Sequence, residues 1–277
     1  MHKKLELKNV YYGYKKNSYI LKNLNLTFPS KKITVILGQN GAGKTTLLKS
    51  LCGFIKPLHG KILLNNKNLN SLSPKEIAKR IAIVGQESNY IFPYTALEMV
   101  VMGRSPHLNF FNTPTKSEEK IAYDSLVMVG ALHLATKKIN EMSSGELQMV
   151  ILARALCQNP DILLLDEPNN HLDIHNQWHL FNLVTKLSIK NNLTVIAILH
   201  SPEFAYWFAD NIIMLKGGKI LHQGSPKQIM NAKNLSKLYD MPVTTYEINE
   251  NYISIVPESI KAKKLVLAYP KTFRIER

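Results

Sequence analysis

The chain has 277 residues, of which 45% are hydrophobic and 20% are charged, and its formal net charge is +15. These values predict a globular protein with a sizeable core, organised as one large domain or as one domain with a subdomain. No apolar run reaches the roughly 18–20 residues of a membrane span, and the first residues lack the apolar stretch of a signal peptide. The lysines are scattered, so the positive charge alone selects neither nucleic acid nor an anionic membrane as a partner.

The predicted elements alternate between strands and helices at both ends of the chain and are all helical in the middle. Cys52 and Cys157 lie in apolar helical patterns without metal-ligand spacing, so we expect buried, inert thiols. The pattern predicts strands at 5–10, 21–28, 33–37, 60–64, 81–84, 161–165, 193–199, 212–215 and 219–223, and helices at 74–80, 96–102, 116–129, 144–157, 175–188, 202–208 and 231–239.

The most informative stretch follows the strand at 33–37 and leads into a helix. It reads Gly38-Gln39-Asn40-Gly41-Ala42-Gly43-Lys44-Thr45-Thr46 and fits the phosphate-loop pattern G-x-x-x-x-G-K-[ST]. Such a loop surrounds phosphate oxygens with backbone N–H groups, and the following helix N-terminus adds partial positive charge. Lys44 is expected to reach the β- and γ-phosphates of a nucleotide, and the Thr45 hydroxyl to hold Mg²⁺.

Two later segments narrow the class of nucleotide-binding protein. Asn140-Glu141-Met142-Ser143-Ser144-Gly145-Glu146-Leu147-Gln148 lies shortly before the apolar run Asp161-Ile162-Leu163-Leu164-Leu165-Asp166-Glu167-Pro168. With the phosphate loop, this order and spacing resembles the nucleotide-binding subunits of ATP-binding cassette (ABC) transporters. The resemblance covers about residues 5–230.

The resemblance implies a role for four side chains beside the phosphate loop. Asp166 would hold the water shell of Mg²⁺, and Glu167 would act as the general base that polarises the attacking water. Gln86 would contact Mg²⁺ and sense the partner, and His200 would bridge the γ-phosphate and the catalytic carboxylate. A lone histidine at a strand end is more often structural, so the role of His200 depends on its place 33 residues after Glu167.

Three further positions follow from the same resemblance. Asp173, in Asn170-His171-Leu172-Asp173, would communicate across a dimer. In Tyr11-Tyr12-Gly13-Tyr14 an aromatic ring would stack on adenine; Tyr14 fits best and Tyr12 is the second choice. The alternative for Tyr14 is a strand aromatic packed in the core.

The segment Met142-Ser143-Ser144-Gly145-Glu146 departs from the family's L-S-G-G-Q. Ser143-x-x-Glu146 is also a capping box, so one interpretation is a helix cap and nothing more. The functional interpretation is that Ser143 and Gly145 bind the γ-phosphate of ATP held by a second copy. Both can hold together, and Ser144 adds a side chain near that nucleotide.

The resemblance also implies partners. A chain with one copy of each motif implies a head-to-tail homodimer with two ATP molecules, joined to a polytopic membrane permease at the cytoplasmic face of the cell membrane. Met102-Gly103-Arg104-Ser105-Pro106-His107, with Phe110-Phe111, resembles ATPases of metal-chelate importers, which take up iron–siderophore, haem, cobalamin or molybdate. A periplasmic or lipoprotein binding protein would then act indirectly, and nucleic acid is not an expected partner.

Two alternatives stay open at this stage: a soluble ABC ATPase that acts on nucleic acid or ribosomes, and an ABC exporter. The expected fold is α/β, a RecA-like P-loop NTPase core with an antiparallel β layer and an all-helical subdomain. The expected division is a core from residues 1–86 and 161–232, a helical subdomain at 87–160 and an extension at 233–277.

Overall fold

The computed structural model describes residues 5–15, 18–85, 92–109, 113–170, 172–249 and 252–258, without the side chains of Tyr14, Lys15 and Asn249. The strands are β1 (Leu5–Lys15), β2 (Ser18–Phe28), β3 (Ile33–Leu37), β4 (His59–Leu64), β5 (Lys67–Asn68), β6 (Ile81–Val84), β7 (Ile162–Asp166), β8 (Thr194–Ile198), β9 (Asn211–Lys216), β10 (Lys219–Gly224), β11 (Val243–Asn249) and β12 (Tyr252–Pro257).

The α-helices are α1 (Lys44–Leu51), α2 (Pro74–Ala78), α3 (Ala96–Val101), α4 (Lys116–Met128), α5 (Ser144–Cys157), α6 (Ile174–Lys190), α7 (Pro202–Phe208), α8 (Pro226–Ile229) and α9 (Ala232–Tyr239). Short 3₁₀ helices are η1 (Leu69–Ser71), η2 (Met102–His107), η3 (Leu132–Leu134) and η4 (Ile139–Glu141). The elements predicted from the sequence are present, with ends that differ by a few residues.

A six-stranded sheet in the order β10-β9-β3-β8-β7-β6 forms the centre of the molecule. Its five strands from β9 to β6 run parallel, and β10 pairs antiparallel with β9 at one edge. The strands β3, β7 and β8 are buried at every position, as expected for parallel strands covered on both faces. The α/β class is therefore confirmed.

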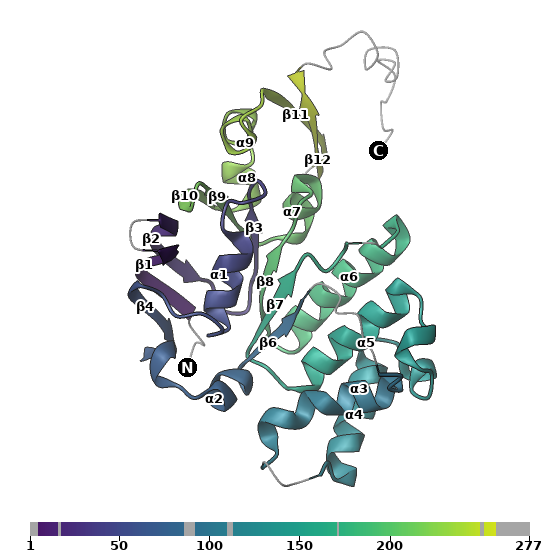
Figure 1. Ribbon diagram of the computed structural model, residues 1–277. Helices are drawn as coiled ribbons and strands as arrows, with labels where there is room; N and C mark the ends of the chain where they lie inside the picture. The colour runs from purple at the N-terminus through teal and green to yellow at the C-terminus, as the bar shows by residue number, and fades with distance from the viewer. Residues whose placement is uncertain are drawn as a thin grey trace, which may run out of the picture.

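Alternate residues of the buried strands enter two hydrophobic cores. Ile33 and Val35 of β3 face the core formed with α3 to α7, whereas Ile36 faces the core formed with α1 and the antiparallel layer. That layer has the strand order β2-β1-β4-β5, so α1 is packed between two sheets (Figure 1). The arrangement fixes the start of α1, and with it the phosphate loop, from both sides.

Between β6 and β7 the described part of the chain contains helices and no strand. Helices α3, α4 and α5 lie where helices were predicted, and they pack on one another (Figure 1). No helix among the described residues is long and apolar enough to cross a bilayer.

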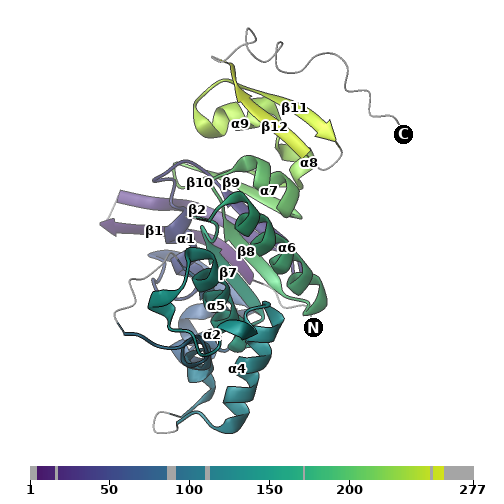
Figure 2. The same cartoon turned by 90° about the vertical axis from the view of Figure 1, so that its right-hand side faces the viewer.

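The C-terminal part adds α9 and the hairpin β11–β12 above α7 and α8 (Figure 2). An aromatic cluster attaches the hairpin to the core. Trp178 of α6 lies 4.2 Å, centroid to centroid, from Trp207 of α7, and it stacks at 19° on Tyr252 of β12. The hairpin is thereby tied to the two helices that follow β7 and β8.

Candidate nucleotide site

The phosphate loop joins the end of β3 to α1 and needs glycine at two of its positions. Gly41 has φ +78° and Gly43 has φ +100°, a region that L side chains rarely adopt. A Cβ on Gly43 would also lie 2.7 Å from Leu21 Cδ2 of β2. Gly38 is constrained by space, because a Cβ there would lie 2.3 Å from the Leu215 carbonyl oxygen of β9.

Lys44, Thr45 and Thr46 form the first turn of α1, where backbone N–H groups lack partners within the helix. Asn40 and Thr45 are exposed, so both are open to a ligand. Lys44 is buried, and its Nζ donates to the carbonyl oxygens of Gly38, at 2.8 Å, and Gln39, at 3.1 Å. Burial lowers the pKa of Lys44, and the negative charges of Glu167 and Asp166 oppose that shift.

Asp166 is the last residue of β7 and is 9% exposed. Its Oδ1 is buried and has no hydrogen-bond partner among the described residues. Burial raises its pKa, the charge of Glu167 adds to that effect, and Lys49, Lys44 and His200 oppose it. Among the described residues, the positive charges near this carboxylate therefore do not outweigh its burial and the charge of Glu167.

Glu167 follows β7 in the left-handed backbone region, with φ +53°, which costs on the order of 1–3 kcal/mol for a residue other than glycine. Its N–H donates to the Ile198 carbonyl oxygen at 3.2 Å, which holds it against the end of β8. His200, two residues beyond β8, places Nε2 2.5 Å from Glu167 Oε1. Asn170 Nδ2 donates to Glu167 Oε2 at 2.7 Å.

The carboxyl ends of β3, β7 and β8 thus gather Lys44, Asp166, Glu167 and His200, which we call the catalytic cluster after the roles that the sequence analysis expects of them. Asn170 is a site residue that the sequence interpretation did not single out. The available signal in the sequence was its spacing of three residues after Glu167. In the structure this spacing forms a turn, in which the Asn170 N–H donates to the Glu167 carbonyl oxygen at 3.2 Å.

A second cluster lies at the start of α5 and α6. Ser143 caps α5: its Oγ accepts from the Glu146 N–H at 3.3 Å, and the Glu146 carboxylate accepts from the Ser143 N–H at 2.8 Å. Lys137 Nζ donates to both Glu146 oxygens at 2.9 Å. The Lys137 and Ser143 hydrogen bonds hold the pKa of Glu146 below its ordinary value.

Asp173 caps α6 by accepting from the Asn176 N–H at 2.8 Å. A Cβ on Gly145 would lie 3.1 Å from the Asn176 side-chain amide, so the two helix starts are in close contact. Ser143, Gly145 and Asp173 form the signature cluster. Among the described residues, neither Ser143 nor Gly145 has a hydrogen bond or ion pair to the phosphate loop.

The tyrosines predicted near adenine lie within β1 rather than in a loop, because β1 continues to Lys15 through several irregular pairings with β2. Tyr12 is partly buried and packs against the core beside α1, which favours a structural role for it. The Tyr14 side chain, and also Gln86, His171, Phe110 and Phe111, lie outside the described residues.

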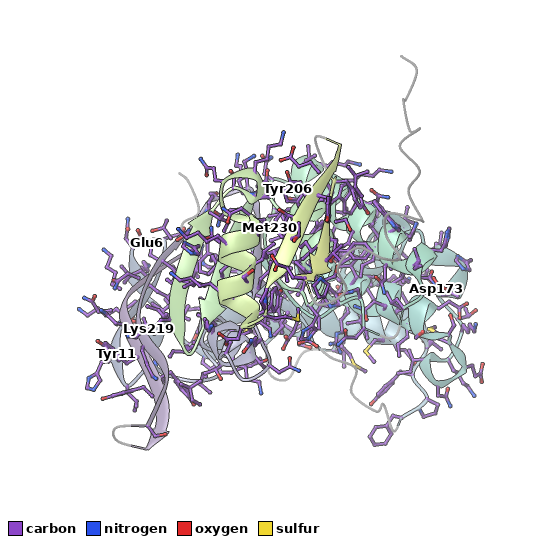
Figure 3. The ribbon with its side chains drawn as sticks, turned by 90° about the horizontal axis from the view of Figure 1, so that it is seen from above. Glu6, Tyr11, Asp173, Tyr206, Lys219 and Met230 are labelled. Atoms are coloured by element: carbon purple, nitrogen blue, oxygen red, sulfur yellow. The ribbon has the colours of Figure 1, made fainter. Side chains whose placement is uncertain are left out.

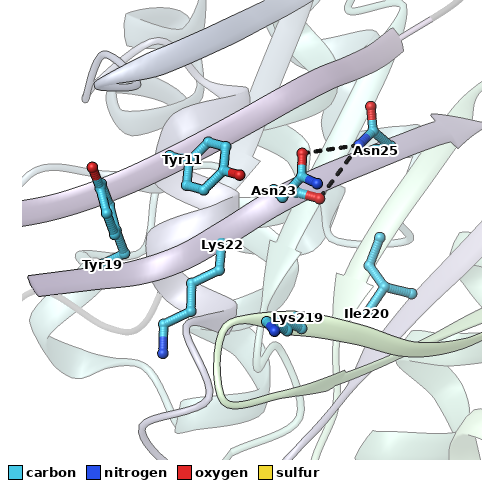
Figure 4. Close-up of a pocket in the computed structure, with 7 residues that line it drawn as sticks. All are labelled: Tyr11, Tyr19, Lys22, Asn23, Asn25, Lys219 and Ile220. Carbon is cyan, nitrogen blue, oxygen red and sulfur yellow. Dashed lines mark hydrogen bonds between the residues drawn. The ribbon is translucent and has the colours of Figure 1, made fainter. Parts of the chain in front are cut away.

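The Tyr11 side chain lines a hollow on the surface between strands, unlike Tyr12, which packs against the core. Tyr11 packs edge-on against Tyr19, and the hollow, of about 550 Å³, lies between β1, β2 and β10 (Figure 4). Seen from above, Tyr11 and Lys219 lie on one side of the molecule and Asp173 on the other (Figure 3). The hollow is lined by Tyr11, Tyr19, Lys22, Asn23, Asn25, Lys219 and Ile220.

Both cysteines are buried and free, as predicted. Burial raises the pKa of Cys52 to about 12 and also raises the pKa of Cys157. A thiol that stays protonated is a poor nucleophile and a poor metal ligand, so neither is expected to take part in chemistry.

Comparison with known proteins decides the family. The family model described as ABC transporter matches residues 21–170. The chain belongs to the ABC transporter family. The P-loop NTPase fold is confirmed by the solved cassettes it resembles, and the activity of the family is ATP hydrolysis.

Among curated relatives of this ABC protein is a probable iron chelatin transport ATP-binding protein from Helicobacter pylori, 40% identical over 86% of this chain and 94% of the relative. A hemin import ATP-binding protein from Escherichia coli O157:H7 is 36% identical over 84% of this chain and 91% of the relative. A solved ABC transporter assigned to the metal-chelate type, in an inward-facing conformation, matches with a TM-score of 0.81 and 30% identity over 93% of this chain and 98% of that one.

Proposed function

We propose that this ABC protein is the ATP-hydrolysing subunit of an importer for a metal chelate such as an iron–siderophore, haem or cobalamin. It would work as a homodimer on the cytoplasmic face of the cell membrane, bound to a polytopic permease. A periplasmic or lipoprotein binding protein would deliver the chelate to that permease. The observation that carries the enzymatic part is the contact of His200 and Asn170 with Glu167 beside Lys44 and Asp166. The printed names of the relatives support the cargo class.

Glu167 is proposed as the base that takes a proton from the attacking water. His200 and Asn170 each bond one of its carboxylate oxygens, which fixes the plane of the carboxylate. A base fixed in this way is ready to orient a water in line with the γ-phosphate. His200 is also exposed enough, at 44%, to contact that phosphate.

Lys44 would exchange its two carbonyl contacts for the β- and γ-phosphates. Until a nucleotide binds, these hydrogen bonds to the loop carbonyl oxygens satisfy the buried ammonium group of Lys44. The loop N–H groups from Gly38 to Thr46 would bind the remaining phosphate oxygens. Tyr14 is the proposed adenine contact.

The residues present fit a Mg²⁺ ion. The unpartnered Oδ1 of Asp166 offers an oxygen ligand or an acceptor for a bound water, and Thr45 and Gln86 are the other proposed ligands. Mg²⁺ commonly binds one or two protein oxygens together with substrate phosphates. When bound, the ion would neutralise charge that develops on the phosphates.

The signature cluster is proposed to complete the site of a second copy. Ser143 and Gly145 start α5, whose N-terminal dipole favours an anion such as the γ-phosphate. Asp173 would meet the partner beside them. The division into a core at 1–86 and 161–232, a helical subdomain at 87–160 and an extension at 233–277 belongs to the same proposal.

A surface for the permease is proposed where α1, α2 and η2 meet. Gly53, after α1, approaches Ile77 of α2, and Lys75 of α2 bonds the Leu108 carbonyl oxygen that follows η2 at 2.7 Å. The two segments that contact α2 each carry an exposed apolar side chain, Phe54 at 68% and Met102 at 39%. A hydrophobic segment of the permease would cover both.

The test is uptake in a strain that lacks this gene, with labelled iron chelate, haem, cobalamin and molybdate. Restored uptake of one chelate by the wild-type chain, but not by Glu167→Gln, is the expected result. Affinity capture should recover a polytopic membrane protein. Ribosome association that RNase removes, without such a protein, would instead favour the nucleic-acid alternative.

A further inference from the structure

The segment Met102–His107 is joined to the C-terminus of α5, the helix whose N-terminus carries Ser143. Arg104 Nη1 donates to the Cys157 carbonyl oxygen at 2.8 Å. His107 Nε2 lies 2.9 Å from the Gln158 carbonyl oxygen, and because a carbonyl only accepts, this nitrogen is the donor. Two side chains of one short segment thus bond two carbonyl groups at the end of α5, that of its last residue, Cys157, and that of the following residue, Gln158. Carbonyl groups at a helix C-terminus lack partners within the helix.

Arg104 is unusual because it is only 8% exposed. No carboxylate among the described residues forms an ion pair with it, and its Nε is buried without a hydrogen-bond partner there. Burying a guanidinium without a counter-ion is costly. The hydrogen bond to Cys157 places the guanidinium at the C-terminus of α5, whose partial negative charge offsets part of that cost.

The neighbouring contacts show that this attachment is close and fixed. A Cβ on Gly103 would lie 2.3 Å from the Arg154 carbonyl oxygen, so a larger residue would push η2 away from α5. Gln158, just beyond α5, donates from Nε2 to the carbonyl oxygens of Ala78 and of Ile81, the latter at 2.8 Å. The end of α5 is therefore held by η2 on one side and by the start of β6 on the other.

From these contacts we propose that Arg104 and His107, which we call the α5 clamp, are positioning residues for ATP hydrolysis. Helix α5 has 14 residues and spans about 21 Å. Because it is a rigid rod, fixing its C-terminus sets the direction in which Ser143 and Gly145 point. Movement of η2, which forms part of the surface proposed for the permease, is thereby carried to the signature cluster. This functional role rests on the proposed function.

The test uses two matched pairs of variants. Arg104→Met removes the donor and keeps most of the apolar stem, whereas Arg104→Lys can still bond the Cys157 carbonyl oxygen. His107→Leu removes the second donor, and His107→Gln retains one. Lys120→Met, at an exposed lysine of α4, controls for the loss of one positive charge in the helical region.

In the dimeric holoenzyme, Arg104→Met and His107→Leu should each lower kcat for ATP at least tenfold. ATP affinity of the single subunit should stay within twofold of wild type, since the phosphate loop is untouched. Arg104→Lys, His107→Gln and Lys120→Met should keep kcat within about threefold. Unchanged kcat in Arg104→Met and His107→Leu would overturn the proposal, and so would a parallel loss of ATP affinity, which indicates general unfolding.

Amide hydrogen exchange on the full chain tests the clamp without any turnover. Arg104→Met should speed exchange at both ends of α5 at least tenfold and leave β3 and β7 unchanged, with rescue in Arg104→Lys. Equal exchange in all variants would refute the clamp even if the wild-type chain hydrolyses ATP. Wild-type protein without ATPase activity, but with the expected exchange pattern, would refute the proposed function and leave the clamp standing.

Discussion

The catalytic cluster and the signature cluster differ in how far each is satisfied by the chain itself. In the catalytic cluster Asp166 Oδ1 has no partner among the described residues, Glu167 has a strained backbone, and Lys44 bonds carbonyl groups of its own loop. In the signature cluster the caps of Ser143 and Asp173 are closed, and Lys137 neutralises Glu146. The catalytic cluster therefore leaves groups for a ligand to pair with, whereas the hydrogen bonds of the signature cluster are already formed before a ligand binds.

This difference predicts that substitutions in the catalytic cluster remove activity while the fold keeps or gains stability. Substitutions in the signature cluster should instead lower both the activity and the stability of the fold. The following three predictions test that contrast, in order of expected effect.

The largest effect is expected for Glu167→Gln. An amide keeps the shape and the contact with His200 but cannot take a proton, so kcat for ATP should fall about 10²–10⁴-fold. ATP should still bind, and the variant should accumulate as an ATP-bound dimer. Steady-state ATPase assays and size-exclusion chromatography with ATP measure both quantities. Glu119→Gln, at an exposed position of α4, is the control; wild-type turnover in Glu167→Gln would remove Glu167 as the base.

Asp166→Asn should separate activity from stability. The pKa of Asp166 is raised in the fold, so the nucleotide-free protein loses stability as the pH rises from the ordinary Asp value through the raised one. The neutral amide avoids that loss. At pH 7 without nucleotide the variant should melt higher than wild type, by about 2–4 °C for each kcal/mol recovered, yet lack Mg²⁺-dependent hydrolysis.

The control for this experiment is Asp210→Asn. Asp210 accepts from Lys32 Nζ at 2.9 Å and from the Ile33 N–H at 2.8 Å, so its carboxylate is satisfied and its replacement should lower the melting temperature. A lower melting temperature for Asp166→Asn as well would show that the catalytic cluster is not short of positive charge.

Ser143→Ala should give the smallest effect. Loss of the cap on α5 should lower the free energy of unfolding by about 1 kcal/mol. Hydrolysis by the dimer should fall about tenfold, with ATP affinity of the single subunit unchanged. Thr115→Ala removes an equivalent cap from α4 and should match the stability loss without the activity loss. Equal activity in the two variants would reduce the signature to a helix cap.

The sequence predicted the parts of the site that depend on short stretches of chain. A β-branched strand, a glycine loop and a helix start are local, as is the Ser143-x-x-Glu146 cap, and each was found where expected. Contacts between distant segments were predictable only where the family resemblance implied them, as for His200 and Glu167. The extension of β1 that packs Tyr12 on the core depends on β2 and β4, and the bond from Arg104 to Cys157 joins residues 53 apart.

The contact between Gly145 and Asn176 has a consequence for how two copies would meet. Gly145 and Asn176 belong to segments about 30 residues apart, yet a Cβ on Gly145 would lie 3.1 Å from the Asn176 side chain, so the two helix starts lie close together. A second copy would therefore encounter one continuous face instead of two independent patches. We therefore expect a second copy to engage both helix starts together.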